Sequence, residues 1–564
     1  MLALLWIAGV VTRSVWTPDE PREYALSVNM LSQSQWAVPQ LGGRAFSEKP
    51  PLTYWAAASS MRAFGTTAVA ARLPNILWGL CTVLAAGALA ASMVAPPLRR
   101  TAALLAGLVC GTAWLNYLHT IWLATDAPLL AGSALALLGA WRSLSAVDAG
   151  ERTRAYAMFH LGLAVAFLAK NLLGLIAPLG AFALFVAWER RWRELLRWQL
   201  WAGLLISGGL IGAWLIAVAR QPDGMSLLRI FLWDNSVGRV LPVATSGDYR
   251  TGHLNSPGKL LSEVALGLLP WLFAALAACG QMFRRAFSGA SDRARARFLL
   301  VAALPLLVFL SFSSTVRDVY ALPAMVPLTA GIAVWALGAP GRATLLATRI
   351  TLWLAGGLLW GLAVLVAWVA MGHVIADARV ALALAATTAL LVLSSRWLAQ
   401  RLPVLRGLAA YATGLAAFLI LASPGIEPGQ DLRPVARAAA MQAGARILLV
   451  TTRDETMTAA LDYATTHRAQ PVPDFDAAAG NDHEVLALIE VDTDRLTPAM
   501  RARLARLSNR LARVAVARAD GVAEQLRASG WTLERDLPNP GGRHYQLWAP
   551  PEPSSGPKTS VASG

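Results

Sequence analysis

A short charged stretch near the start of the chain holds the residue types best suited to chemistry. Residues 17–55 read TPDEPREYALSVNMLSQSQWAVPQLGGRAFSEKPPLTYW. Asp19 precedes Arg22 by three residues, and Glu48 stands beside Lys49, so each acid has a base nearby in the chain. Acids and bases paired in this way can bind an anionic phosphate and can orient or deprotonate a hydroxyl group. The stretch therefore predicts a site that meets a phosphate.

The same stretch also has a purely structural interpretation. Thr17 and Glu20 have the spacing of a capping box with Pro at the first helical position, and acids at a helix start complement the helix dipole. Tyr24, Val28 and Leu31 would form an apolar stripe, so we expect this helix to lie in the membrane interface with its charges near headgroup depth. A helix cap needs only one acid, however, and capping does not explain the later SEKPP cluster. A functional role for the charged residues of this stretch is therefore favoured.

Further candidates lie where apolar segments end. Asp126, in LATDAPLL, begins an apolar run; a charge at such depth indicates function, although it could also cap a helix. Lys170 closes another apolar segment, where it could bind a ligand or extend toward the headgroups. Arg317 and Tyr320 lie in the turn STVRDVYALP. We expect these residues near headgroup depth on the same side as Asp19.

The composition is that of an integral membrane protein. Of the 564 residues, 56% are hydrophobic and 15% are charged, and apolar runs near the ~20 residues that cross a bilayer recur along the first three quarters. We expect thirteen transmembrane helices, at about residues 2–16, 69–94, 101–119, 121–141, 155–170, 172–188, 197–219, 259–283, 298–314, 319–338, 345–372, 378–397 and 404–423. Arg residues concentrate in alternate loops, which places the N-terminus inside and the C-terminus outside.

Charge and cysteine usage exclude other classes of protein. The formal net charge is +16, but much of it lies in cytoplasmic loops that face anionic lipid, so we discard nucleic-acid binding. Cys81, Cys110 and Cys279 all fall in apolar spans and predict neither a disulfide nor a metal site. The sequence has no glycine-rich P-loop motif and no Cys/His metal spacing.

The chain divides into a membrane part and a soluble part. Two outer loops, at about residues 17–68 and 220–258, are too long to be simple connectors, which indicates a site on that side. The soluble part should contain strands at RILLVTT and HEVLALIEVD, a helix near residues 498–514 and a hairpin through NPGGRHYQLWAP. The expected units are a transmembrane domain over 1–423, an α/β domain outside the cell membrane over 424–550 and a disordered tail over 551–564.

Three motifs carry a resemblance to a known family. TPDEPREYALSVNML, VPQLGGRAFSEKPPLTYW and TDAPLL resemble the signature of the polyprenyl-phosphate-dependent, membrane-embedded GT-C glycosyltransferases, in particular the bacterial lipid A aminoarabinosyltransferases, which are related to protein O-mannosyltransferases. The match is specific over the first 130 residues and extends through LAKNLLGLIAP, DNSVGR and VYALPAMVPL. It implies a polytopic α-helical membrane protein of GT-C type, with about 13 transmembrane helices and a C-terminal periplasmic α/β domain.

The resemblance also implies roles for individual residues. Asp19 and Asp126 correspond to the acid pair at the reaction centre. Glu48, together with His253 of the second long loop, would bind a divalent metal, Zn or Mg/Mn, although His253 taken alone is an ordinary loop residue. The residues assigned to the lipid phosphate are Arg22, Lys49, Lys170, Arg239, Arg317 and Tyr320.

The expected reaction is an inverting sugar transfer at the periplasmic face of the bacterial inner membrane. The sugar, such as 4-amino-4-deoxy-L-arabinose, would pass from undecaprenyl phosphate to lipid A or another periplasmic acceptor. Cations would stabilise the departing phosphate, and an acid would orient the acceptor. Two alternatives remain: a protein O-mannosyltransferase-like or other GT-C enzyme, and a lipid-linked sugar transporter, which should show repeated broken helices with charges near mid-membrane.

Overall fold

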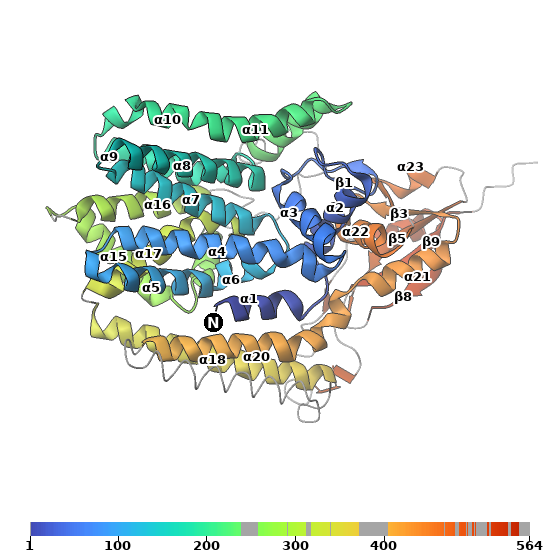
Figure 1. Ribbon diagram of the computed structural model, residues 1–564. Helices are drawn as coiled ribbons and strands as arrows, with labels where there is room; N and C mark the ends of the chain where they lie inside the picture. Colours follow the sequence, from blue (N-terminus) through green and yellow to red (C-terminus); the bar gives the residue numbers. More distant parts are fainter. Residues whose placement is uncertain are drawn as a thin grey trace, which may run out of the picture.

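The protein is a bundle of long helices with a small mixed sheet at one end (Figure 1). The structure is a computed structural model. It describes residues 2–237, 258–289, 292–311, 317–338, 340–371, 404–466, 469–479, 484–491, 493–494, 499–500, 502–503, 516–517, 521–539 and 543–551.

Most helices run along the bundle. They are α1 (Leu2–Val11), α4 (Ala68–Ser92), α5 (Arg99–Thr112), α6 (Trp114–Ile121), α7 (Asp126–Ser145), α8 (Ala149–Lys170), α9 (Leu173–Trp188), α10 (Trp198–Ala202), α11 (Leu204–Ala219), α14 (Lys259–Gly267), α15 (Leu272–Ala286), α16 (Arg293–Ser311), α17 (Leu322–Gly338), α18 (Arg342–Met371) and α20 (Val404–Gln430). The connections contain η1 (Pro96–Leu98), η2 (Trp192–Leu196), α12 (Gly224–Arg229), the π-helix η3 (Ile230–Val237) and η5 (Asp318–Ala321).

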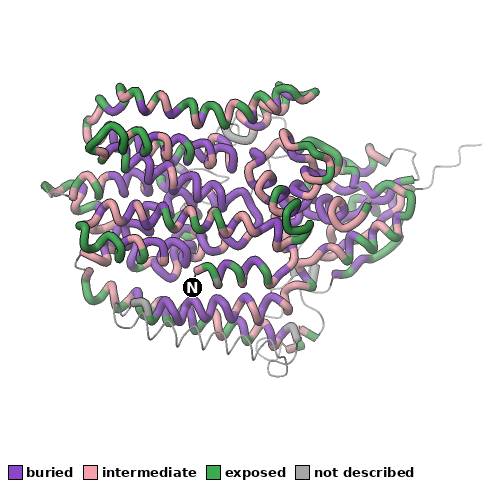
Figure 2. Tube along the Cα trace, viewed as in Figure 1, coloured by how far each residue is buried: buried purple, intermediate pink, exposed green. Residues whose placement is uncertain are grey.

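Burial increases toward the middle of the bundle (Figure 2). In α7, 89% of the apolar window is buried, against 22% in the window of residues 198–219 and 22% in that of residues 342–369. Both poorly buried segments are strongly hydrophobic and lie on the outside of the bundle. Apolar helices that leave this much surface uncovered need lipid around them. The protein is therefore embedded in a membrane.

The expected spans overlap helices wherever the structure describes them, with three corrections besides a shift of the span expected over 121–141, which is the helix Asp126–Ser145. The segment 101–119 is a bent pair, α5 and α6, at an angle of 69°, and 259–283 is another, α14 and α15, at 111°. The helix expected over 2–16 ends at Val11. Six of the described helices are long and apolar enough to cross a membrane, or up to eight if each bent pair is one span. The span at 378–397 lies outside the described residues, and the total of thirteen stays a prediction.

A backbone hydrogen bond joins the two bends. At the first, Ala113 has an extended backbone, and the next amide, of Trp114, donates to the carbonyl of Leu269 at the second bend, at 2.9 Å. Pro270 follows Leu269 and disfavours a helical conformation there. A backbone amide freed inside apolar surroundings needs a new acceptor. Hydropathy alone cannot reveal this pairing, so the sequence predicted straight spans.

The elements at the end of the bundle are shorter. They are α2 (Glu20–Gln33), α3 (Leu52–Phe64), β1 (Gln40–Leu41), β2 (Arg44–Ala45), α21 (Arg433–Ala443), β3 (Ile447–Thr451), α22 (Glu455–Ala464), β4 (Ala469–Val472), α23 (Phe475–Ala479), β5 (Val485–Val491), β6 (Thr493–Asp494), β7 (Val516–Ala517), α26 (Val522–Ala528), β8 (Thr532–Leu537) and β9 (His544–Ala549). The main sheet has the order β4-β3-β5-β9-β8; β4, β3 and β5 are parallel, while β9 is antiparallel to both β5 and β8.

Strands β3 and β5 and the final hairpin of this sheet lie where the sequence placed them, whereas β4 was not predicted. RILLVTT contains β3, HEVLALIEVD contains β5, and the hairpin through NPGGRHYQLWAP is formed by β8 and β9. Side chains of alternate strand positions pack on the two faces, one against α21 and α22 and the other against α23 and α26. Most of the helix expected near residues 498–514 lies outside the described residues.

The helix of the opening stretch differs from its prediction in two ways. It begins at Glu20, with Asp19 as N-cap residue and no capping side-chain hydrogen bond, because Thr17 instead donates to Gln430 of α20 at 2.6 Å. Its stripe does not face lipid: Tyr24 packs edge-on against Tyr463 of α22, with ring centroids 5.2 Å apart. The capping box was wrong, and the apolar stripe packs against protein, because tertiary partners contact these side chains; the depth of the helix in the membrane stays a prediction. The helix lies between α3 and α22.

Candidate active site

Asp19 lies at the N-terminus of α2, where the bundle meets the sheet. Its Oδ1 is 3.2 Å from Nη2 of Arg22, and its Oδ2 accepts a hydrogen bond from Nη2 of Arg317 at 3.0 Å. The first pair is the predicted i, i+3 contact, and the second joins residues 298 positions apart. The side chain of Asp19 is 26% exposed, so a ligand can reach it.

The electrostatic surroundings keep Asp19 ionised. Burial alone would raise its pKa, but the positive charges of Arg22, Lys49 and Arg317 outweigh burial and hold the pKa at about 2. Such an acid carries a full negative charge at neutral pH and is a weak base. It can therefore orient an acceptor or attract a cation more readily than it can remove a proton.

Arg22 is the centre of the charged cluster. Its Nη2 donates to Oε1 of Glu23 at 2.9 Å, and its Nη1 donates to Oε2 of Glu455, the first residue of α22, at 2.6 Å. Lys49 donates to the same oxygen of Glu23 at 2.5 Å. The turn before α3 thus brings Lys49 to Arg22, as the sequence predicted for two phosphate-binding bases.

Asp126 forms a second acid–base pair. It is the first residue of α7, and it is bonded to Lys170, the last residue of α8. Nδ1 of His119 is 3.4 Å from its other oxygen. The ammonium of Lys170 also lies over the ring of Tyr320, 5.4 Å from the centroid. The α7 and α8 ends therefore bring together three of the residues that the sequence selected.

Arg317 is the third cation that acts on Asp19, beside Arg22 and Lys49. It is bonded to Asp19 and also senses the charge of Asp126, and it precedes η5, which carries Tyr320. Burial opposes its charge, but Asp19 and then Asp126 raise its pKa above the ordinary value. A guanidinium bonded to Asp19 can stabilise negative charge that develops at this site.

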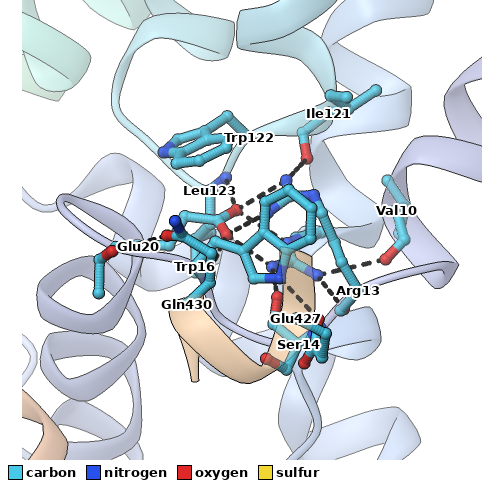
Figure 3. Close-up of polar contacts among 12 residues, drawn as sticks. Val10, Arg13, Ser14, Trp16, Glu20, Ile121, Trp122, Leu123, Glu427 and Gln430 are labelled. Atoms are coloured by element: carbon cyan, nitrogen blue, oxygen red, sulfur yellow. Dashed lines mark hydrogen bonds and ion pairs between the residues drawn. The ribbon is translucent and has the colours of Figure 1, made fainter. Parts of the chain in front are cut away.

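A buried carboxylate next to Asp19 holds this end of the protein together. Glu20 has no exposed surface and accepts hydrogen bonds from Arg13, from Arg72 at 2.7 and 2.9 Å, and from the amide of Leu123 at 2.8 Å. Figure 3 shows Glu20, Arg13 and Leu123 pointing toward one another, with Glu427 of α20 beside them. Glu20 thus connects the start of α2 to the loop that leads into Asp126.

Not every predicted site residue can be placed. Arg239 and His253 lie outside the described residues. Glu48 lies near enough to Arg22 and Glu455 to affect the pKa of each. In the parts of the chain that the structure describes, no three His, Cys, Asp or Glu side chains form a group that could hold a metal ion. Glu48 and His253 as metal ligands therefore stay a prediction.

Sequence reasoning missed four charged residues of this region. Arg13 and Arg72 lie within apolar segments, which is itself a signal that could have marked them as partners of a buried acid. Glu23 was overlooked because it stands in a stretch full of acids. Glu455 carries no local signal, since its partner lies 433 positions away.

The fold and the charged junction define a class of protein. A bundle of apolar helices with a mixed sheet at one end is the GT-C type of membrane fold, which comparison with solved structures supports. ArnT from Cupriavidus metallidurans bound to undecaprenyl phosphate superposes with a TM-score of 0.66 at 18% identity, over 97% of this chain and 96% of that one. The apo oligosaccharyltransferase of Archaeoglobus fulgidus gives a TM-score of 0.50 at 12% identity, over 89% and 70%.

Sequence comparisons identify the particular relatives. Residues 48–216 match the family described as dolichyl-phosphate-mannose-protein mannosyltransferase. The undecaprenyl phosphate-α-4-amino-4-deoxy-L-arabinose arabinosyl transferase 2 of Pseudomonas fluorescens is 27% identical over 58% of this chain and 53% of its own length. The corresponding transferase of Yersinia enterocolitica is 27% identical over 66% and 65%. The chain thus spans between half and two thirds of the length of these relatives.

Proposed function

We propose that this protein is a membrane glycosyltransferase that takes a sugar from a polyprenyl phosphate. The observation that carries the proposal is the presence of two acid–base pairs, Asp19 with Arg22 and Asp126 with Lys170, the first of which is also bonded to Arg317. The relatives named above use undecaprenyl phosphate and aminoarabinose. We extend both to this chain and take lipid A, on the periplasmic side of the inner membrane, as the acceptor.

The reaction transfers the anomeric carbon of the sugar with inversion. The bond from that carbon to the phosphate oxygen of the donor breaks, and a bond from the same carbon to an acceptor oxygen forms. Undecaprenyl phosphate departs with one more negative charge, which Arg22, Lys49 and Arg317 would stabilise. No covalent intermediate with the protein is needed.

The acids act on the acceptor side. An acceptor phosphate is already anionic and needs no base. The carboxylates would act indirectly: they would orient the arginines and lysines that bind this phosphate, and they would bind the amine of the donor sugar. An acceptor hydroxyl would have to lose a proton, and an acid with a pKa of about 2, such as Asp19, is a poor base for that step. The site therefore favours a phosphate acceptor over a hydroxyl.

The family match supports a second candidate. A dolichyl-phosphate-mannose-protein mannosyltransferase match over residues 48–216 is compatible with a protein hydroxyl as acceptor. A sugar transporter receives less support, because the acid–base pairs described here gather at one end of the bundle rather than along its middle.

The decisive experiment measures transfer with purified protein in proteoliposomes. Undecaprenyl-phosphate aminoarabinose is offered with lipid A, and separately with a Ser/Thr peptide, and products are identified by mass spectrometry. Asp19→Asn should abolish transfer, whereas Asp292→Asn, which alters an acid paired with Arg285 at the other end of the bundle, should not. Product on the peptide alone would support the mannosyltransferase-like alternative, and near-normal turnover by Asp19→Asn would reduce Asp19 to a structural N-cap.

A further inference from the structure

Glu455 brings the soluble part of the chain into contact with the candidate phosphate site. Its carboxylate is 2.6 Å from Nη1 of Arg22, and both side chains are partly accessible, at 22% and 12%. The other bonds of the guanidinium point elsewhere: Nε and Nη2 face Glu23, and Nη2 also reaches Asp19. Glu455 therefore binds Nη1 of Arg22, whereas Asp19 and Glu23 bind the Nε and Nη2 side of the guanidinium.

This contact is built into the packing of α22 on α2. Thr456 donates to the carbonyl of Pro18 at 3.0 Å, next to Glu455. Nearly two helical turns further on, Asp462 accepts from the side chain of Asn29 at 3.0 Å and from the amide of Gly42 at 2.8 Å. Contacts at both ends of α22 fix its register, so the position of Glu455 is determined by the fold.

Gly42 contributes to this register because of its backbone. It lies in the two-residue turn between β1 and β2, with φ of 57°, and Gly43 follows with φ of 73°. Two successive positive φ angles are typical of a tight hairpin turn and favour glycine. The turn directs the amide of Gly42 at Asp462. A residue with a side chain at position 42 would disfavour this backbone conformation.

The charges around Arg22 do not suit a phosphate while Glu455 is in place. Four carboxylates, of Asp19, Glu23, Glu48 and Glu455, surround three cations, Arg22, Lys49 and Arg317. An arriving phosphate would meet a cluster with excess negative charge and an arginine whose Nε, Nη1 and Nη2 each already donate to a carboxylate. Binding requires that one carboxylate give up its place.

Glu455 is the carboxylate best able to do so. Glu23 is fully buried and binds both Arg22 and Lys49. Asp19 is bonded to two arginines, which hold its pKa at about 2. Glu455 is more weakly stabilised as an anion: burial, together with repulsion from Glu48, raises its pKa above the ordinary value despite Arg22.

We propose that Glu455 is a built-in competitor of the donor phosphate, which occupies Nη1 of Arg22 in the free protein and is displaced when the lipid phosphate binds. The inference rests on the proposed function, because it takes Arg22 as a phosphate ligand. It makes the soluble part a determinant of donor affinity. Removing the charge of Glu455 while keeping its shape should therefore tighten phosphate binding.

The test uses the full chain in detergent with undecaprenyl phosphate as the probe, and binding is followed by titration. Glu455→Gln should lower the Kd by about three- to tenfold, the effect expected of one partly exposed ion-pair partner. Glu534→Gln is the matched control: Glu534 is also in the soluble part, 23% exposed and 2.7 Å from Arg446. It should leave the Kd unchanged.

Two further variants separate the possible outcomes. Arg22→Ala should weaken binding, and adding Glu455→Gln to it should change nothing more if Glu455 acts through Arg22. An unchanged or higher Kd for Glu455→Gln, with Arg22→Ala still weakened, would overturn the competitor role and leave the proposed function standing. If wild type binds no undecaprenyl phosphate, or if Arg22→Ala binds it as well as wild type, the phosphate site itself fails. Equal unfolding temperatures would show that the comparisons are between folded proteins.

Discussion

The adjacent acids Asp19 and Glu20 should respond to amide substitution in opposite ways. Glu20→Gln would leave Arg13 and Arg72, both 1% exposed, without the charge that compensates them. Breaking a buried ion pair by removing one partner costs about 3–5 kcal/mol, because an uncompensated charge stays buried. We expect Glu20→Gln to lower the unfolding temperature by several degrees or to prevent stable folding. Asp19→Asn should fold normally and lose activity.

The pKa of Glu20 gives an independent magnitude for the same effect. Burial raises this pKa, but Arg13 and Arg72 outweigh burial and lower it from 4.5 to about 2. A lowering of that size corresponds to about 3 kcal/mol of stability, in agreement with the cost of breaking the pair. Because the folded-state pKa is depressed, this contribution is fully present above pH 4.5 and is lost as the pH falls toward 2. The wild type should therefore lose stability in that acid range.

The assay is thermal unfolding of purified protein in detergent, followed through the intrinsic fluorescence of its 22 tryptophans. Wild type, Glu20→Gln and Asp19→Asn are compared at neutral pH and at about pH 3.5, where the advantage of wild type over Glu20→Gln should shrink. Adding Arg72→Met to Glu20→Gln should recover part of the loss, because one uncompensated charge is then gone. An unfolding temperature of Glu20→Gln equal to that of wild type at neutral pH would refute the structural role of the cluster.

Three other predictions address the ligand, the metal and the membrane orientation. Lys49→Ala should raise the donor KM by about tenfold, near 1.4 kcal/mol, whereas Lys259→Ala should have little effect; equal effects would indicate bulk charge rather than a phosphate site. If a metal bound through Glu48 is required, a chelator should reduce transfer and added Zn or Mn should restore it, while Glu48→Gln should be insensitive to both. In a cysteine-free background, Ser34→Cys should react with an impermeant thiol reagent in spheroplasts and Glu194→Cys should not. The reverse labelling pattern would place the acids on the cytoplasmic side. Lipid A at its mature location could then not be the acceptor.

The sequence by itself determined the class of protein and much of the candidate site. Apolar length is a local property, so it predicted the helices, and short continuous apolar runs predicted β3 and β5. Asp19 with Arg22 was predictable because residues three apart share a helix face. Asp126 and Lys49 were candidates from their own positions, but only the motif resemblance placed them in one site with Asp19, because no spacing rule connects residues so far apart.

Only the tertiary structure decided which charges meet. Arg317 reaches Asp19 across 298 positions and Glu455 reaches Arg22 across 433, and no periodicity encodes contacts of that range. The capping box failed for the same reason: buried arginines from α4 and from the segment after α1 bind Glu20 more favourably than a helix end can. Buried charges must be paired wherever a partner can be found, so the packing of distant segments, rather than the neighbouring residues, set the final partners of these acids.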